Sequence, residues 1–466
     1  MNTNLKNILS LFSTDIAVRI IGFIATAYLA RVLGKSGFGE INIALSVLTY
    51  SSILSNSGLV LLGTRKVITQ KEKIDSVAGE IFYTRFILTL LIFLVTSIIC
   101  YLFVNSELNK IILFYLLFLF PSAFLLEWFF TGYQKMDTLS IGRIVGMITY
   151  LAFILLFVNS PDDAALSGIG WTLGGLVNAY LLWSVYRRFG FSTKLIRSDF
   201  KIFTLLKETF PLGAAGFISQ FYIAFPIIYL GITATNSDVG SFSAAFKIIT
   251  LFLIFDRVFN FIFFPKITSL MSGSPESLEE VFNKILKIIS VFSLFIAMIV
   301  IITGEYIITT AFGKAYVDAV IILQVLTGYL LFTLLNSVFT YTFIGMHKDK
   351  VYTFSLLLAL PVFILLTFSL TPFFGTMGVV YSFIFFDLVS MVYMLFKLKK
   401  IITIKFFRTV VFPLFITFGI VLPIFYLSQL SFYFEIILIT LIYLPLIALI
   451  AGINKSEINF LRRVLT

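Results

Sequence analysis

The sequence contains few charged residues, one cysteine and one histidine. Charged residues make up 12% of its 466 residues, against roughly 25% in ordinary soluble domains. The single cysteine, Cys100, excludes an intramolecular disulfide. The single histidine, His347, lies in the short polar stretch MHKDK and cannot assemble a metal cage alone. We therefore expect neither a disulfide framework nor a metal site.

Motifs for catalysis and for nucleotide hydrolysis are also missing. No GxxxxGK[ST] stretch occurs, so the chain carries no ATPase of that type. No recognisable motif positions a Ser/His/Asp set or a pair of carboxylates. The basic residues are scattered over separate loops without a binding motif, which argues against nucleic acid as a partner. We expect a protein that is not an enzyme and that needs no organic cofactor.

Long apolar runs dominate what the sequence does contain. Hydrophobic residues make up 59% of the chain, with 56 Phe among them, and no polar shell could cover so much apolar surface. A helix crosses a bilayer with about 20 apolar residues. The sequence predicts an all-α polytopic membrane protein with about fourteen spans, near 8–30, 41–62, 80–103, 111–131, 140–158, 164–186, 208–231, 239–265, 282–303, 317–344, 351–370, 376–396, 408–427 and 432–452.

The Lys and Arg residues are distributed unevenly between the two sides of these spans. One set of alternate loops holds only four of them, Arg31, Lys35, Lys110 and Lys314. The other basic residues outside the span interiors, Arg85 among them, fall on the opposite side. Cytoplasmic loops carry the excess of positive charge. The bias predicts a multi-pass protein of the cytoplasmic (inner) membrane with both termini in the cytoplasm.

An internal repeat is visible between LGKSGFGEINIALSV (33–47) and ATNSDVGSFSAAFKI (234–248). When the two are aligned, Ser36, Gly39 and Ala44 fall on Ser237, Gly240 and Ala245. Each stretch leads into a span with a polar stripe at helical spacing, and the aligned stripes are Asn42, Ser46, Thr49 and Asn56 in the first and Ser243, Lys247, Thr250 and Arg257 in the second. Repeats that face each other are the common plan of secondary transporters, with the binding site between them.

Three cations, Arg19, Lys247 and Arg257, fall inside predicted spans. Arg257 belongs to LFLIFDRVFNFIFF (251–264), an otherwise apolar run. A cation at the centre of a lipid-facing helix costs roughly 2.5–3.5 kcal/mol. Facing a water-filled cavity would avoid that cost and would offer an anion a path. The alternative is that ion pairs pin the helices together, because three acids also lie deep, namely Asp15, Asp256 and Asp387.

Three stretches resemble a known family: ARVLGKSGFGEINIALSVL (30–48), FTGYQKM (130–136) and AFGKAYVDAVIILQVL (311–326). Their order and spacing are similar to those of the bacterial polysaccharide-unit flippases. These are the Wzx-type O-antigen and capsule transporters of the multidrug/oligosaccharidyl-lipid/polysaccharide exporter (MOP) superfamily. The resemblance covers about residues 5–400 of the chain. It implies two six-helix lobes around a central cavity, 1–200 and 201–400, and two additional transmembrane helices within 401–466.

The resemblance also implies a cargo and a site. The cargo would be an oligosaccharide repeat unit linked by pyrophosphate to a polyprenyl chain, carried across the membrane by alternating access for surface polysaccharide biosynthesis. Arg19, Lys247 and Arg257 are the positions that fit the family's basic cavity residues. Asp15 or Asp387 would bind H⁺ or Na⁺ to drive the return step. The polar candidates in the same cavity are Asp15, Asp256, Asp387, Asn42 and Asn56.

The sequence also leads us to expect further partners and leaves two alternative functions open. Membrane lipid and other polysaccharide assembly proteins are the expected partners besides the cargo. A MATE-like drug or cation exporter would use acidic residues as its binding site, whereas the polar stripe here is basic. A membrane polysaccharide polymerase or ligase would need a large outer loop, and the longest predicted one, near 304–316, is short.

Overall fold

A computed structural model describes residues 3–69, 74–192, 202–269 and 275–421, and then 437, 441, 443–457, 459 and 462. The described residues form helices and connecting turns, with no strand among them. The chain divides into two compact units, residues 1–243 (unit 1) and 244–466 (unit 2). The finer division into lobes 1–200 and 201–400 with a C-terminal pair of helices in 401–466 stays a prediction.

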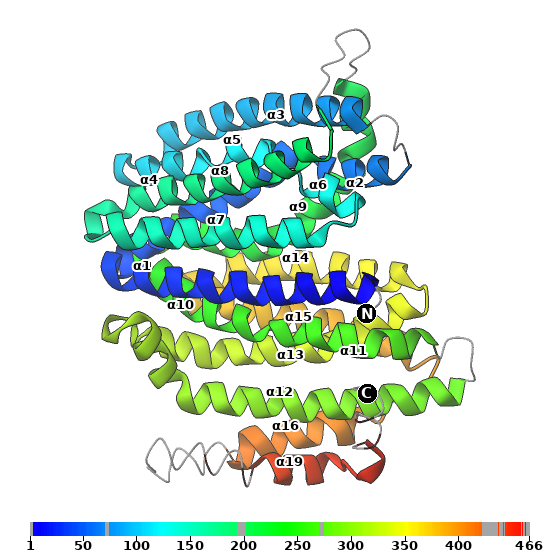
Figure 1. The fold of residues 1–466 in the computed structure, drawn as a ribbon. Coiled ribbons are helices and arrows are strands. Elements are labelled where there is room, and N and C mark those ends of the chain that lie inside the picture. Colours follow the sequence, from blue (N-terminus) through cyan, green and yellow to red (C-terminus); the bar gives the residue numbers. More distant parts are fainter. Residues whose placement is uncertain are drawn as a thin grey trace. The chain divides into compact units, whose positions relative to one another are not determined.

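Unit 1 is a bundle of helices that pack side by side (Figure 1). Helix α1 packs against α7 and α9, and α7 packs along α8. The elements of this unit are α1 (Thr3–Asn56), α2 (Leu59–Thr69), α3 (Ile74–Phe103), α4 (Ser106–Leu116), α5 (Leu119–Ala123), α6 (Glu127–Gly132), α7 (Met136–Phe157), η2 (Pro161–Asp163), α8 (Ala164–Arg188) and α9 (Ile202–Thr233).

Unit 2 is a second helical bundle in which α13 packs against α12, α15 and α11, and α14 packs along α15. Helix α10 contains the boundary between the two units. The elements are α10 (Asn236–Phe252), α11 (Ile254–Ser269), α12 (Pro275–Phe312), η3 (Lys314–Tyr316), α13 (Ala319–Gly345), α14 (Asp349–Phe374), α15 (Thr376–Leu398), η4 (Phe407–Val411), α16 (Phe412–Ile416), η5 (Thr417–Val421) and α19 (Leu444–Ala451).

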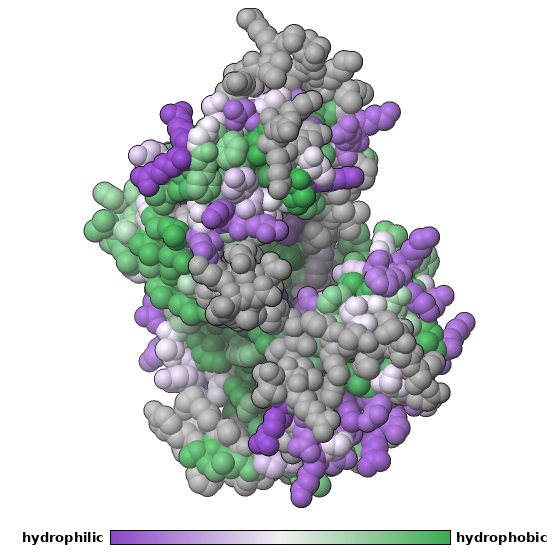
Figure 2. All heavy atoms as spheres, turned by 45° about the vertical axis from the view of Figure 1, so that its right-hand side comes forward, coloured by the Kyte–Doolittle hydropathy of each residue, from purple (hydrophilic) through white to green (hydrophobic). Residues whose placement is uncertain are grey.

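The helices have the length and the surface of membrane-spanning segments. Ten of them, counted over the described residues, are long and apolar enough to cross a bilayer, and two shorter apolar helices accompany them. Large apolar side chains are exposed, for example Phe103 at 82% and Phe373 at 81%. Figure 2 shows broad hydrophobic areas on the visible surface. Lipid covers such a surface at no cost, and the predicted all-α polytopic fold is confirmed.

Every predicted span up to residue 396 coincides with helix, but several of these helices are interrupted. Helix α1 contains the first two predicted spans, joined by a kink at Gly34, whose φ of 67° favours glycine. The fourth predicted span, 111–131, is divided into α4, α5 and α6. The eighth, 239–265, is interrupted at Leu253. The last two, 408–427 and 432–452, lie partly outside the described residues.

Arg85 stabilises the interrupted segment that runs from α4 to α6. Its guanidinium donates to the carbonyl oxygen of Leu125 at 3.0 Å and to that of Ser122 at 2.5 Å. Those carbonyls lie at the end of α5 and in the turn before α6, where the regular helical hydrogen-bond pattern is broken. The assignment of Arg85 to an inner loop is therefore wrong: Arg85 lies inside α3 and is 6% exposed. Its charge binds backbone carbonyls inside the unit.

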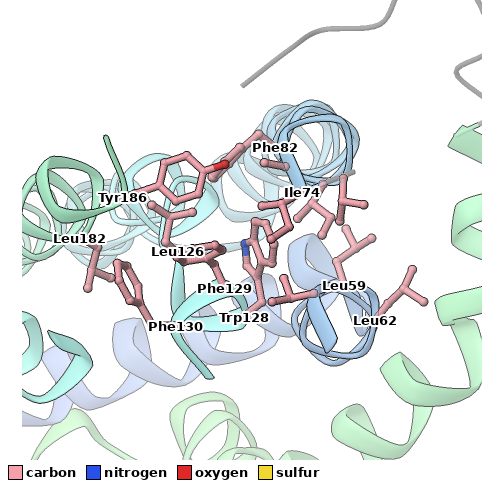
Figure 3. Packing of buried hydrophobic residues seen from close by; sticks show 14 of the residues in the cluster. Leu59, Leu62, Ile74, Phe82, Leu126, Trp128, Phe129, Phe130, Leu182 and Tyr186 are labelled. Carbon is pink, nitrogen blue, oxygen red and sulfur yellow. The ribbon is translucent and has the colours of Figure 1, made fainter. Parts of the chain in front are cut away.

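The FTGYQKM stretch follows an aromatic core at one end of unit 1. Trp128, Phe129 and Phe130 of α6 have no exposed surface and pack with side chains of α2, α3 and α8 (Figure 3). Gly132 allows α6 to approach α2, because a methyl group there would meet Val67 within 2.8 Å. The stretch thus fixes how α6 joins α2 in this unit.

Candidate functional site

Asp387 is a carboxylate buried inside unit 2, with 5% of its surface exposed. It lies on α15, and its partners come from α13. Asn336 donates from Nδ2 to Asp387 Oδ1 at 3.2 Å, and the hydroxyl of Thr333 contacts Oδ2. None of the ion pairs among the described residues involves Asp387. An ionised carboxylate buried without a cation is costly, so this environment suits a group that binds a proton or a small cation.

The single hydroxyl hydrogen of Thr333 can serve only one of its two acceptor contacts at a time. Thr333 Oγ1 lies 2.9 Å from the carbonyl oxygen of Tyr329 and also contacts Oδ2 of Asp387. A hydroxyl has one hydrogen to donate and two lone pairs. If it donates to Tyr329, the contact with Asp387 needs a proton on the carboxyl group, which then donates to Thr333. Both contacts are satisfied together when Asp387 is protonated.

A second acid, Asp256 of α11, also meets α13. Tyr341 donates its hydroxyl hydrogen to Asp256 Oδ2 at 3.2 Å. The other oxygen, Oδ1, is buried without a hydrogen-bond partner in the described structure, and so is Oδ1 of Asn336. Buried polar atoms normally have partners, and an exception needs an explanation. One of these unpartnered oxygens belongs to α11 and the other to α13, the helix that also contacts Asp387.

The sequence analysis identified Asp256 and Asp387 but missed their partners on α13. Thr333 and Tyr341 stand eight residues apart in LLFTLLNSVFTYTF (330–343), with Asn336 between them. This spacing places the first two near one helical face. The sequence signal that could have identified these partners is their helical spacing as polar residues within an apolar run.

The three predicted cavity cations are divided between the units. Arg19 lies half-buried on α1 in unit 1, one turn from Asp15, which is also half-buried. In unit 2, Lys247 is half-buried on α10 and Arg257 is exposed on α11, immediately after Asp256. All three cations and Asp15 have interaction partners in the structure. Their role towards an anionic cargo, and the ion-pair alternative, stay predictions.

The two asparagines on α1 make local hydrogen bonds. Asn42 donates from Nδ2 to the carbonyl oxygen of Phe38 at 2.8 Å, one turn earlier in the same helix. Asn56 accepts at Oδ1 from the backbone N–H of Val60 at 3.2 Å, in the turn that starts α2. Asn56 therefore satisfies a helix-terminal donor. Both are half-buried, and their participation in a cavity stays a prediction.

Two curated proteins that are similar to this chain are named as O-antigen transporters. A protein of Escherichia coli (strain K12), named as a candidate O-antigen transporter, is 22% identical over 391 residues, which cover 81% of this chain and 93% of that protein. A protein of Shigella dysenteriae with the same name is 26% identical over 416 residues, which cover 84% of this chain and all of that protein.

Comparison with solved structures identifies the fold. The lipid II flippase MurJ, in an inward closed conformation, superposes with a TM-score of 0.73 at 17% identity, covering 98% of this chain and all of that one. A multidrug resistance MATE family transporter of the MOP superfamily, facing inward, superposes with a TM-score of 0.64 at 17% identity, covering 82% of this chain and 94% of that one. The chain thus shares its fold with the lipid II flippase MurJ and with this MATE transporter.

A family model described as "Polysaccharide biosynthesis protein" matches residues 4–271, more than half of the chain. This match includes both copies of the internal repeat, 33–47 and 234–248. Together with the helical fold and the transporter relatives, it confirms the resemblance found in the sequence. The chain belongs to the polysaccharide biosynthesis protein family.

Proposed function

We propose that this protein carries polyprenyl-pyrophosphate-linked oligosaccharide repeat units across the cytoplasmic membrane by alternating access, as a step of surface polysaccharide biosynthesis. Membership of the polysaccharide biosynthesis family is the observation on which the proposal rests. The names of the two curated relatives and the fold shared with a lipid II flippase support it. The sugar units are too polar to cross hydrocarbon unaided, so they need a protein path.

The proposed binding groups for the cargo are the cations Arg19, Lys247 and Arg257. A pyrophosphate is an anion with many acceptor oxygens, and charge-assisted hydrogen bonds to it are strong where water is scarce. Arg supplies paired donors to a phosphate, whereas Lys supplies a point charge. The proposal requires that the cations of both units reach one common cavity, while the prenyl chain stays in lipid.

The proposed coupling groups are the two acids that α13 contacts, Asp387 of α15 and Asp256 of α11. Asp387 has neutral hydrogen-bond partners, Thr333 and Asn336, and Asp256 is held by Tyr341. Binding of H⁺ or Na⁺ there would neutralise buried negative charge, and release would restore it. A change of charge inside a packed helical unit alters the relative stability of two conformations. Asp15 is the other candidate for this role.

We also propose that both termini lie in the cytoplasm and that the protein does not act as an enzyme. The excess of Lys and Arg on one side of the spans supports a chain with both termini in the cytoplasm. The curated relatives are named as transporters, and the protein is proposed to move its cargo without chemical change. Other polysaccharide assembly proteins are the proposed partners, since they would supply and consume the lipid-linked unit.

A second candidate function is export of a small organic cation. The buried acid Asp387 and the half-buried acid Asp256 favour it, because acidic residues attract cations, and so does the fold shared with MATE transporters. Overexpression should then protect cells against ethidium or norfloxacin. The flippase proposal predicts no protection.

The test of the main proposal is to locate the lipid intermediate in cells that lack the gene. Single-unit lipid-linked intermediates should accumulate on the cytoplasmic face of the membrane. Loss of a polymerase would instead leave them on the outer face. Complementation with Arg19→Ala or Arg257→Ala should not relieve the accumulation, whereas Lys314→Ala should, since Lys314 is an exposed cation of η3. Intermediates found on the outer face would contradict the proposal.

A further inference from the structure

A groove of about 590 Å³ lies in unit 1 where α3 and α4 meet. Its walls are the C-terminal part of α3, from Phe93 to Val104, and one face of α4, from Ser106 onwards. The α4 residues that line it recur at helical spacing, so a single face of that helix is turned towards the groove. The volume falls within the range of roughly 300–1,000 Å³ that is typical of ligand sites.

One end of the groove is polar and carries a positive charge. Ser106, Asn109 and Lys110 lie there, within the first turns of α4. Lys110 is exposed, and none of the ion pairs among the described residues involves it. This end of the groove therefore offers a cation to an anion.

The rest of the groove is apolar and as long as one leaflet of a bilayer. Phe93, Leu113, Phe114 and Leu117 line it. The distance along α3 from Val104 to Phe93 is roughly 16 Å at 1.5 Å per residue. Half of a hydrocarbon core that is roughly 30 Å thick is about 15 Å. An acyl chain that starts at the polar end would thus reach the middle of the bilayer along these side chains.

The aromatic side chains at the polar end place it at the membrane surface. Tyr101, which lines the groove, is 77% exposed, and Phe103, at the end of α3, is 82% exposed. Aromatic side chains gather at the headgroup level of membrane proteins. The cation of Lys110 is therefore at the depth of lipid phosphates, on the side where the loops are poor in basic residues.

We propose that this groove binds one anionic glycerophospholipid, with phosphatidylglycerol as the lipid to be tested. Lys110 pairs with the phosphodiester, and one acyl chain follows Phe93, Phe114 and Leu117. A phosphatidylethanolamine would instead bring its own ammonium next to Lys110, which is unfavourable. The site lies within unit 1 and does not depend on the proposed cargo.

The experiment uses native mass spectrometry of the full-length protein, purified in detergent and titrated with defined lipids. Wild-type protein should bind phosphatidylglycerol roughly tenfold more tightly than phosphatidylethanolamine, the effect of one charge-assisted contact in a partly apolar site. Lys110→Gln should abolish this preference, and Lys110→Arg should keep it. The matched control is Lys314→Gln, an exposed cation of η3 in unit 2, which should change nothing.

Two further measurements keep the proposal open to refutation. Glycerophosphoglycerol, the headgroup without acyl chains, should bind at least tenfold more weakly than the lipid; equal binding would overturn a lipid site. A phosphatidylglycerol with a diazirine in its acyl chain should crosslink wild-type protein on peptides that contain Phe93, Phe114 or Leu117. Crosslinks confined to other helices, or a preference that survives Lys110→Gln, would also overturn it. The crosslinking uses only wild-type protein and so does not depend on the folding of any variant.

Discussion

Gly39 of α1 and Gly240 of α10 make reciprocal backbone contacts. A methyl group on Gly39 would overlap the carbonyl of Asn236, and one on Gly240 would overlap the carbonyl of Lys35. The sequence offset that relates the two glycines also relates Lys35 to Asn236. Each copy of the internal repeat therefore presents the same residue position to the same position of the other copy, as a local two-fold axis requires.

This contact supports the internal repeat that the sequence indicated through sparse identities. Two backbones approach closely only where side chains are absent, which explains glycine at both positions. Asn236 also donates from Nδ2 to Glu40 Oε1 at 2.8 Å beside the contact. Repeats related by a pseudo-two-fold axis are the usual basis of alternating access in secondary transporters.

Replacing either glycine should separate the two segments. Gly39→Val and Gly240→Val should each lower the thermal unfolding midpoint, because overpacking of a close contact typically costs about 1–3 kcal/mol. Gly304→Ala is the control, since a methyl group there would meet its neighbours at ordinary distances of 3.7 Å or more. Unfolding of a fluorescent fusion in detergent would measure the effect. Midpoints for both valine variants that match the alanine control would argue against the reciprocal contact.

Arg85 should be essential for the stability of unit 1. Arg85→Met removes the side-chain donors to the carbonyls of Ser122 and Leu125, and within the described structure only the Ser122 carbonyl keeps a backbone donor, the N–H of Leu125 at 3.2 Å. We expect a loss of about 3 kcal/mol in the free energy of unfolding. The exposed cation Arg65 of α2 offers the control Arg65→Met, which should be nearly neutral. Equal stability of the two variants, measured by thermal unfolding, would refute this account of Arg85.

Asp387→Asn should leave folding intact while abolishing the coupling of transport to an ion gradient. The amide resembles a protonated carboxyl group and can still meet Thr333 and Asn336, so the variant should fold normally. It cannot release a proton or attract a cation, and transport driven by a pH or Na⁺ gradient in proteoliposomes should fall at least tenfold. Asp256→Asn allows the same comparison at the second acid. Gradient-driven transport at the wild-type rate in Asp387→Asn would exclude this carboxyl group as the coupling site.

The C-terminal segment is held by a pH-sensitive contact. Lys287 of α12 donates from Nζ to Glu457 Oε1 at 2.8 Å and to the carbonyl oxygen of Gly452 at 3.0 Å. Burial opposes the charge on Glu457, but hydrogen bonds from Lys287 and from the backbone N–H of Asn454 outweigh it and lower the pKa of Glu457. Because the pKa of Glu457 is lower in the folded state, its ionised carboxylate stabilises the folded protein. This contribution is complete at pH values above the unfolded-state pKa of about 4.3.

This stabilisation should be lost as the pH falls through the lowered pKa of Glu457. Between about pH 6 and pH 3.5, the unfolding midpoint should therefore fall more in the wild type than in Glu457→Gln, which has no charge to lose. Glu280→Gln is the control, because Glu280 pairs with Lys284 at 2.6 Å on the exposed surface of α12. Identical pH profiles for wild type and Glu457→Gln would show that the contact contributes nothing.

Much of the fold could be predicted because apolar length is a direct requirement of the bilayer. Each predicted span up to residue 396 is helical in the structure for that reason. An apolar run has the same hydropathy whether its helix is continuous or interrupted. The turns between α4 and α6 and at Leu253 were therefore not predicted. Hydropathy also misplaced Arg85, because a charge near a span end usually belongs to a loop, whereas this one binds the carbonyls of Ser122 and Leu125.

The candidate site was predictable only in part. Asp256 and Asp387 were evident because a charge in an apolar run is unusual. Their partners Thr333 and Tyr341 were missed, since Thr and Tyr are common in membrane helices and only the packing of α13 against α11 and α15 gives them a role. Asn56 was assigned to a polar stripe, and its bond to the N–H of Val60 depends on a turn that helical periodicity does not reveal.

The most direct test of the central claim is flipping by purified protein in proteoliposomes. A fluorescent polyprenyl-pyrophosphate oligosaccharide would be supplied in the outer leaflet of the vesicles. Flipping would be followed as the fraction of its fluorescence that a membrane-impermeant quencher can no longer reach. We expect rapid flipping with wild-type protein and with Lys314→Ala, and a loss of at least tenfold with Arg19→Ala, Lys247→Ala or Arg257→Ala. Wild-type rates in all three cation variants, at equal amounts of folded protein, would contradict the claim that these residues bind the pyrophosphate.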